Sequence, residues 1–284
     1  MPLATHAALR YVTPLREGGS LPALVETDGG LFVVKFRGAG QGARALVAEL
    51  IVGGLARRLG LPLPEVAVVD LSPDFGRAEP DPEIQDILRG SAGPNVGLGF
   101  VPGAFAYEPS AHADLVDPDL AADVVWLDAL TTNIDRTARN PNLLVARSES
   151  DTGKGPRLWL IDHGAALYFH HNWAAVDADR ARAPFAPIRD HVLLPVAGPV
   201  EAADARLAPR LDDAAVAAVL ADVPDALLMD APDGRQPPFD SADATREAYA
   251  DFFRQRLGGP RRWAEDAARA QAERPDASPL AYRR

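Results

Sequence analysis

The chain has 284 residues, of which 47% are hydrophobic, and its net charge is −11 at pH 7. This length allows one large domain or two lobes with ample core, while the acidic balance disfavours a nucleic-acid binder, which usually shows a basic patch, and an anionic membrane surface as a partner. Cysteine is absent, which excludes disulfides and cysteine zinc sites. The sequence shows no signal-peptide pattern and no apolar run that approaches the ~18–20 residues of a membrane span, so we expect a cytoplasmic protein.

The first part of the chain predicts short strands with a glycine-rich loop between the first two. Gly18, Gly19 and Ser20 of this loop fit either an ordinary hairpin turn or a loop whose backbone N–H groups face a ligand. The order strand, glycine-rich loop, strand, turn and strand resembles the start of a kinase fold. The predicted strands are residues 8–15, 23–27 and 31–37, and the turn is 28–30.

A lysine stands in the middle of the apolar third strand. Lys35 and Lys154 are the chain's only lysines, and every other strong cation is arginine. Burying an ammonium costs free energy unless it is paired, and lysine is a compact charge that proteins use to bind phosphates. Glu49, beside the apolar stripe of a helix predicted over 43–59, is either its partner or a solvated surface residue.

The next segment predicts two further strands and a connection to the second half of the chain. The strands are expected over 64–71 and 96–101, with a polar loop, a short helix and a turn between them. In the kinase-like order of strands, Phe100 and Val101 at the end of the second strand and Gly103 beyond it would form a hinge, where backbone groups would read the edge of an adenine.

The stretch from Val124 to Leu167 carries the chemistry. An apolar helix over about 118–133 delivers Asp135 to its C-terminal end, and Asn140 follows five residues later. Strands over 140–146 and 157–161 then lead to Asp162. Two carboxylates and an amide on loops between buried elements suit magnesium, which takes oxygen ligands from one or two carboxylates and substrate phosphates. Taken alone, this set also fits many metal hydrolases.

Histidines follow the same stretch, and the remaining chain predicts helices. His170 and His171 are adjacent and would point to opposite faces of a strand, and no His-x-x-x-His pair is present, so packing is favoured over metal ligation. A further alternative is a metal-dependent hydrolase whose site would consist of Asp162, His163, His170 and His171. That alternative would leave Lys35 and the spacing of Asp135 and Asn140 without a role. The predicted helices are residues 212–223, 243–259 and 260–274.

Two motifs in order resemble those of kinases. The run DRTARN at 135–140 has the spacing D-x-x-x-x-N of the kinase catalytic loop, and LIDHGAAL at 160–167 resembles the metal-binding loop, with His163 in place of phenylalanine. With the glycine-rich loop and VVKFRG, most of residues 8–175 resembles a HipA-like kinase domain of the compact kind found in actinobacteria. The resemblance implies an α+β, two-lobed protein-kinase-like fold, with a small, mainly antiparallel β N-lobe (1–103) and a larger, mainly helical C-lobe (104–284).

The resemblance also implies ATP and Mg²⁺ as cofactors. Asp135 would accept or orient the proton of the attacking hydroxyl, and Arg136 would stabilise charge or anchor the loop. Asn140 and Asp162 would hold the metal, and Lys35 would contact the ATP phosphates. The expected function is transfer of the γ-phosphate to a hydroxyl of a protein Ser or Thr, or of a small molecule. The alternative is a nucleotide-binding pseudokinase, and nucleic acid and membrane are not expected as partners.

Overall fold

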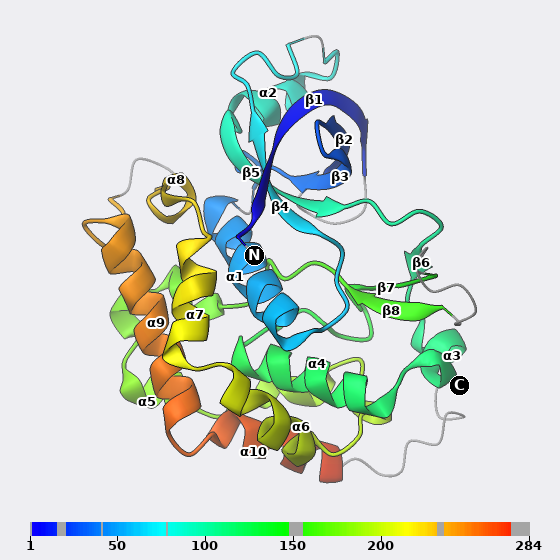
Figure 1. The fold of residues 1–284 in the computed structure, drawn as a ribbon, viewed down its shortest axis with the longest axis vertical. Helices are drawn as coiled ribbons and strands as arrows, with labels where there is room; N and C mark the ends of the chain where they lie inside the picture. The colour runs from blue at the N-terminus through cyan, green and yellow to red at the C-terminus, as the bar shows by residue number, and fades with distance from the viewer. Residues whose placement is uncertain are drawn as a thin grey trace.

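The computed structural model describes residues 2–15, 21–40, 42–77, 79–147, 156–231 and 236–273. The N-terminal part forms a closed β-barrel with the strand order β1-β2-β3-β5-β4 (Figure 1). All neighbouring strands are antiparallel except β1 and β4, which pair in parallel through Ala4–Ala7 and Ala67–Asp70. The strands are β1 (Ala4–Pro14), β2 (Ala23–Thr27), β3 (Gly30–Lys35), β4 (Val66–Leu71) and β5 (Gly93–Gly99).

The predicted strands of the barrel are confirmed, with shifts at several of their ends. Strand β1 starts at Ala4 rather than at residue 8, because its first residues pair with β4. Strand β5 starts at Gly93, which pairs with Leu71, and ends before Phe100. The expected loop residues Gly18, Gly19 and Ser20 lie outside the described residues.

Helix α1 (Gly42–Leu59) lies between the barrel and the helices that follow (Figure 1). It is buried on nearly all sides, because barrel residues such as Val66 and helical residues such as Val219 pack on different sides of it within one apolar core. A Cβ on Gly54 would lie 2.6 Å from a methyl of Val219, so the close approach of the next helices requires glycine there. Glu49 is therefore fully buried, and the alternative of a solvated surface glutamate is wrong.

The C-terminal part is mainly helical, with one small sheet of β6, β7 and β8. The expected order, a β-sheet followed by a helical part, is confirmed, while the boundary between residues 103 and 104 stays a prediction. No helix in the described ranges is long and apolar enough to cross a membrane. Helix α2 (Pro82–Arg89) lies between β4 and β5 of the N-terminal part. The elements that follow the barrel are β6 (Phe105–Ala106), α3 (Pro109–His112), α4 (Pro118–Leu130), β7 (Leu143–Ala146), β8 (Arg157–Leu160), α5 (Ala178–Arg182), α6 (Val200–Leu207), α7 (Asp213–Ala221), α8 (Asp225–Leu228), α9 (Ala242–Gly258) and α10 (Arg262–Ala272).

Helix α4 is held at its C-terminal end by a buried arginine of α9. The Arg256 guanidinium donates to the carbonyl oxygens of Leu130 at 2.6 Å and Ala129 at 2.6 Å. A cation at this end of a helix pairs with carbonyls that have no partner within the helix and complements the helix dipole. Burial lowers the pKa of Arg256 to about 9. This contact fixes the point from which the chain enters the loop that carries Asp135.

Candidate functional site

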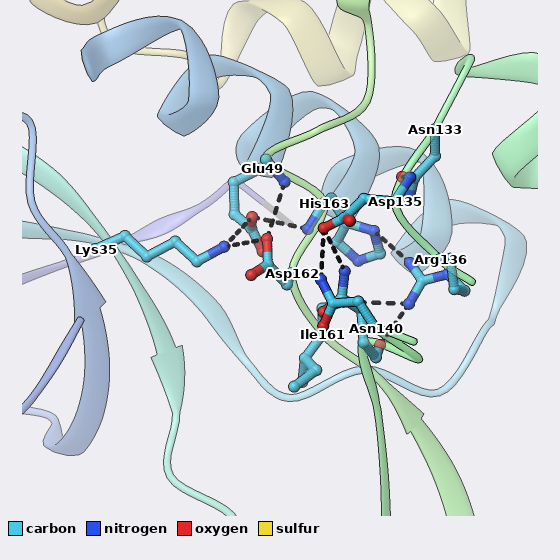
Figure 2. A network of polar contacts seen from close by, with 11 residues as sticks. Lys35, Glu49, Asn133, Asp135, Arg136, Asn140, Ile161, Asp162 and His163 are labelled. Carbon is cyan, nitrogen blue, oxygen red and sulfur yellow. Dashed lines mark hydrogen bonds and ion pairs between the residues drawn. The ribbon is translucent and has the colours of Figure 1, made fainter. Parts of the chain in front are cut away.

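Three charged side chains from the barrel, from α1 and from the segment after β8 meet in one place (Figure 2). The Lys35 Nζ lies 2.9 Å from Glu49 Oε2 and 2.6 Å from Asp162 Oδ1. Glu49 is the predicted partner of Lys35, and Asp162 is a second one. The side chains of Lys35 and Glu49 are 7% and 1% exposed, whereas that of Asp162 is 37% exposed and reaches the surface.

The electrostatics of this triad keep Lys35 charged. Burial works against its ammonium, yet the carboxylates of Glu49 and Asp162 raise the pKa of Lys35 above its ordinary value. Burial raises the pKa of Glu49 despite the opposing effect of Lys35. Burial also works against the ionised form of Asp162, but here the ammonium prevails and the pKa of Asp162 is lowered. Asp162 is thus an ionised carboxylate at neutral pH.

The Asp135 loop (residues 133–142) folds back on itself and places Asn140 beside Asp135. Thr137 and Asn140 exchange backbone hydrogen bonds of 3.1 Å in both directions, which closes the loop. Asp135 Oδ2 accepts hydrogen bonds from Asn140 Nδ2 at 2.6 Å and Asn142 Nδ2 at 3.2 Å. The motif D-x-x-x-x-N therefore brings its two ends into direct contact, and this explains the spacing physically.

Arg136 points away from Asp135 into the protein, and its side chain is 0% exposed. It donates to Asp128 Oδ2 at 2.5 Å, to the backbone carbonyls of Asn142 and Ile161, and to His163 Nδ1 at 3.1 Å (Figure 2). Between the two roles expected for Arg136, this geometry favours anchoring of the loop over direct contact with a transferred group.

The sequence reading missed the buried polar group that holds Arg136. Asp128 of α4 accepts hydrogen bonds from Asn133 Nδ2 at 3.0 Å and from His191 Nε2 at 2.9 Å, in addition to Arg136. Burial alone would raise the pKa of Asp128, but the charge of Arg136 and the His191 hydrogen bond hold it well below its usual range. The available signal was an aspartate inside the apolar helix run VVWLDAL, since a charge there must be paired.

Backbone strain gathers at the edges of the two loops. Four non-glycine residues with positive φ bracket the Asp135 loop and the Asp162 loop (residues 162–167). Thr132 is the most unusual, because a β-branched residue is an outlier in the left-handed region. Strained residues persist where the surrounding structure over-determines them, and they cluster at functional sites. The four residues are Thr132 (φ 54°), Asn142 (φ 49°), Asp162 (φ 53°) and Leu167 (φ 54°).

Of the two histidines after the Asp162 loop, His170 is buried and His171 is exposed. His170 is buried, and its Nδ1 lies 2.9 Å from the hydroxyl of Tyr249. Burial, with the nearby charges of His171 and Arg44, lowers the pKa of His170 well below its ordinary value. In the described part of the chain no group of three or more His, Cys, Asp or Glu side chains is arranged to hold a metal ion. For His170, burial and the contact with Tyr249 describe a packing residue, while the preference for packing at His171 stays a prediction.

The predicted hinge lies beside a cavity of about 410 Å³. Phe100 and Val101 line it together with Glu65 and Trp159, but Lys35 and Asp162 do not. The backbone N–H of Phe100 already donates to the carbonyl of Leu31 at 2.9 Å. An adenine contact by Phe100, Val101 or Gly103 stays a prediction.

Comparison with known proteins identifies the fold and the family. No curated protein matches the chain. The crystal structure of the Helicobacter pylori proinflammatory kinase CtkA aligns with 96% of this chain and 99% of that chain at 12% sequence identity and a TM-score of 0.55. This likeness shows the fold, so the predicted kinase-like fold is confirmed. A family model described as HipA-like kinase matches residues 12–183, a span that contains Lys35, Asp135 and Asp162. The chain therefore belongs to the HipA-like kinase family.

Proposed function

We propose that the protein is an ATP- and Mg²⁺-dependent phosphotransferase that moves the γ-phosphate of ATP to the hydroxyl of a protein serine or threonine. The observation that carries this proposal is the convergence of Lys35, Glu49 and Asp162 next to the paired Asp135 and Asn140 (Figure 2). Membership of the HipA-like kinase family supports it. A small-molecule hydroxyl is the alternative acceptor.

Each residue of the site has a distinct role in this proposal. Lys35 contacts ATP phosphates, and Glu49 holds its ammonium in place. Asp135 accepts or orients the proton of the attacking hydroxyl, and Asn140 keeps the Asp135 carboxylate oriented through its 2.6 Å hydrogen bond. Phosphoryl transfer passes through a loose transition state, so positioning and charge neutralisation provide most of the catalysis.

The donor set fits a magnesium ion. Two carboxylates face one ammonium in the triad, and Glu49 Oε1 is buried without a hydrogen-bond partner among the described residues. Asn140 is exposed and Asp162 is partly exposed, so their side-chain oxygens are accessible to a ligand. Magnesium is bound through one or two carboxylates plus substrate phosphates rather than by an all-protein cage. Asn140 and Asp162 would hold the ion, which supplies positive charge to the phosphate oxygens.

A nucleotide-binding pseudokinase is disfavoured by the residues present. Lys35, Asp135, Asn140 and Asp162 are all in place, and none of them is replaced by an apolar residue. A metal-dependent hydrolase built on the histidines is disfavoured because His163 and His170 are buried and their Nδ1 atoms lie against Arg136 and Tyr249.

The proposal is tested by thermal stabilisation with ATP, measured with and without Mg²⁺, followed by release of ADP. A kinase is stabilised by ATP, more strongly with Mg²⁺, and turns ATP over. Stabilisation without turnover would instead support a pseudokinase. The absence of any response to ATP would contradict both and favour the hydrolase.

A further inference from the structure

His163 follows Asp162 directly and is fully buried. Its backbone N–H donates to Glu49 Oε2 at 2.8 Å, the same oxygen that accepts from Lys35. Through this bond, helix α1 holds the backbone of the Asp162 loop at the residue next to the carboxylate. Asp162 itself has a φ of 53°, a conformation that costs free energy and persists only when neighbouring contacts maintain it.

The imidazole ring of His163 makes the second connection, on the side of the Asp135 loop. Its Nδ1 lies 3.1 Å from Arg136 Nη2 (Figure 2). A guanidinium only donates hydrogen bonds, so Nδ1 is the acceptor and the ring carries its proton on Nε2. Burial, followed by the charge of Arg136, lowers the pKa of His163 to about 3, which agrees with a neutral acceptor ring.

Arg136 is a rigid anchor for this hydrogen bond. Its charge is balanced by Asp128. Its other donors bind the carbonyl of Asn142, at the end of the Asp135 loop, and the carbonyl of Ile161, just before Asp162. Asp128 is fixed in turn by His191, whose Nδ1 accepts from the backbone of Leu193, so that Nε2 is the donor to Asp128. Asp128, Arg136 and His191 are thus each held by more than one hydrogen bond.

We propose that His163 is a positioning residue that sets the Asp162 carboxylate for the metal by joining it to both helix α1 and the Asp135 loop. This inference rests on the proposed function. A phenylalanine at this position would fill a similar volume but would leave a buried Arg136 N–H without an acceptor. The residue therefore acts through Asp162 and Arg136, and it does not contact the reacting atoms.

The chemistry of the side chain permits a sharp set of variants. In His163→Asn the amide oxygen is attached to Cγ, as Nδ1 is in histidine, so the acceptor toward Arg136 is kept. In His163→Gln the polar end lies nearer to the position of Nε2, and the acceptor at Nδ1 is lost. His163→Phe removes it entirely. The matched control is the same series at His112 of α3, whose Nδ1 is also an acceptor, in this case of the backbone N–H of Glu108 at 2.8 Å.

The test measures the Mg²⁺ concentration that gives half of the maximal thermal stabilisation in the presence of adenylyl imidodiphosphate, which is not hydrolysed. Loss of a residue that orients a metal ligand typically weakens metal binding or activity by about 10–100-fold. We expect an increase of about tenfold or more in His163→Gln and His163→Phe. His163→Asn should stay within about threefold of the wild type, and the His112 variants should be unchanged. If the phenylalanine variant does not fold, the asparagine and glutamine pair decides.

The two claims fail in different ways. A wild type whose stability does not respond to Mg²⁺ with the nucleotide contradicts the proposed function, and with it the inference. A responsive wild type whose His163→Gln variant has the same half-saturating Mg²⁺ concentration overturns the positioning role alone.

Discussion

Lys35 Nζ lies 2.6 Å from Asp162 Oδ1, although 127 positions separate the two residues in the chain. The contact joins the last residue of strand β3 to the loop that follows strand β8. Glu49 of α1 binds the same ammonium and also the backbone of His163. The barrel, helix α1 and the helical part therefore meet at one charged cluster, and a change at any member reaches the others.

Replacing Lys35 should remove turnover without unfolding the protein. In Lys35→Met the phosphates lose their cation, and removal of one such electrostatic donor typically costs about 10²–10³ in kcat. We expect a loss of at least about 10²-fold in ADP release, with a cooperative melting transition retained. Lys154→Met changes the only other lysine and should match the wild type. Equal rates for the two variants would contradict the role of Lys35.

Asp128 should contribute far more to stability than Asp123, which lies five residues earlier on the same helix. Asp128→Asn leaves the buried Arg136 without a counter-charge, and breaking such a pair costs about 3–5 kcal/mol. Asp123 pairs with Arg206, whose side chain is 40% exposed, so Asp123→Asn should cost less than about 1 kcal/mol. Urea unfolding of the two variants measures the difference. Similar losses would show that the buried network does not hold the Asp135 loop.

Stability should fall in mild acid, in part through His170. The folded protein keeps this histidine neutral, with its pKa well below the ordinary 6.5, whereas the unfolded chain takes up a proton below about pH 6.5. The contribution is therefore fully present above that pH and is lost as pH falls. In His170→Asn, which keeps an acceptor for Tyr249, the loss in unfolding free energy between pH 7 and pH 5 should be about 1–2 kcal/mol smaller. An unchanged pH dependence would contradict this assignment.

Glycine at position 132 should stabilise the protein. Thr132 has a φ of 54°, and its Oγ1 is buried without a hydrogen-bond partner among the described residues. Strain and an unsatisfied hydroxyl each cost about 1–3 kcal/mol, which outweighs the ~1 kcal/mol entropic cost of glycine. Thr131→Gly is the contrast, since Thr131 has a φ of −91° and its hydroxyl donates to Leu127. Calorimetry should show a higher unfolding temperature for Thr132→Gly and not for Thr131→Gly. Lower unfolding temperatures in both variants would contradict the assignment of strain to Thr132.

Local patterns predicted the parts of the fold that depend on nearby residues. The strand β2, the turn into β3 and helix α1 follow from alternation, glycine and helical spacing, and the motif from Asp135 to Asn140 closes within six residues. The parallel pairing of β1 with β4 joins residues about sixty positions apart, and no short-range pattern encodes it.

The network behind the site was hidden for the same reason. Asp128 and His191 are 63 positions apart, and each alone reads as an isolated polar residue. Glu49 is buried against Lys35 of β3 and the backbone of His163, which lie 14 and 114 positions away in the chain, so the spacing of residues within α1 did not show its burial. The two partners of His163, Glu49 and Arg136, lie 114 and 27 positions away in the chain, so no local pattern indicates its contacts.

The most direct test of the proposed function is the rate of ADP release from saturating Mg-ATP in the wild type and in Asp135→Asn. Loss of the group that orients the attacking hydroxyl should reduce the rate by about 10²–10⁴-fold, with stabilisation by ATP retained. The exposed Asp240 provides the control variant Asp240→Asn, which should keep the wild-type rate. A rate in Asp135→Asn equal to that of the wild type would contradict the account.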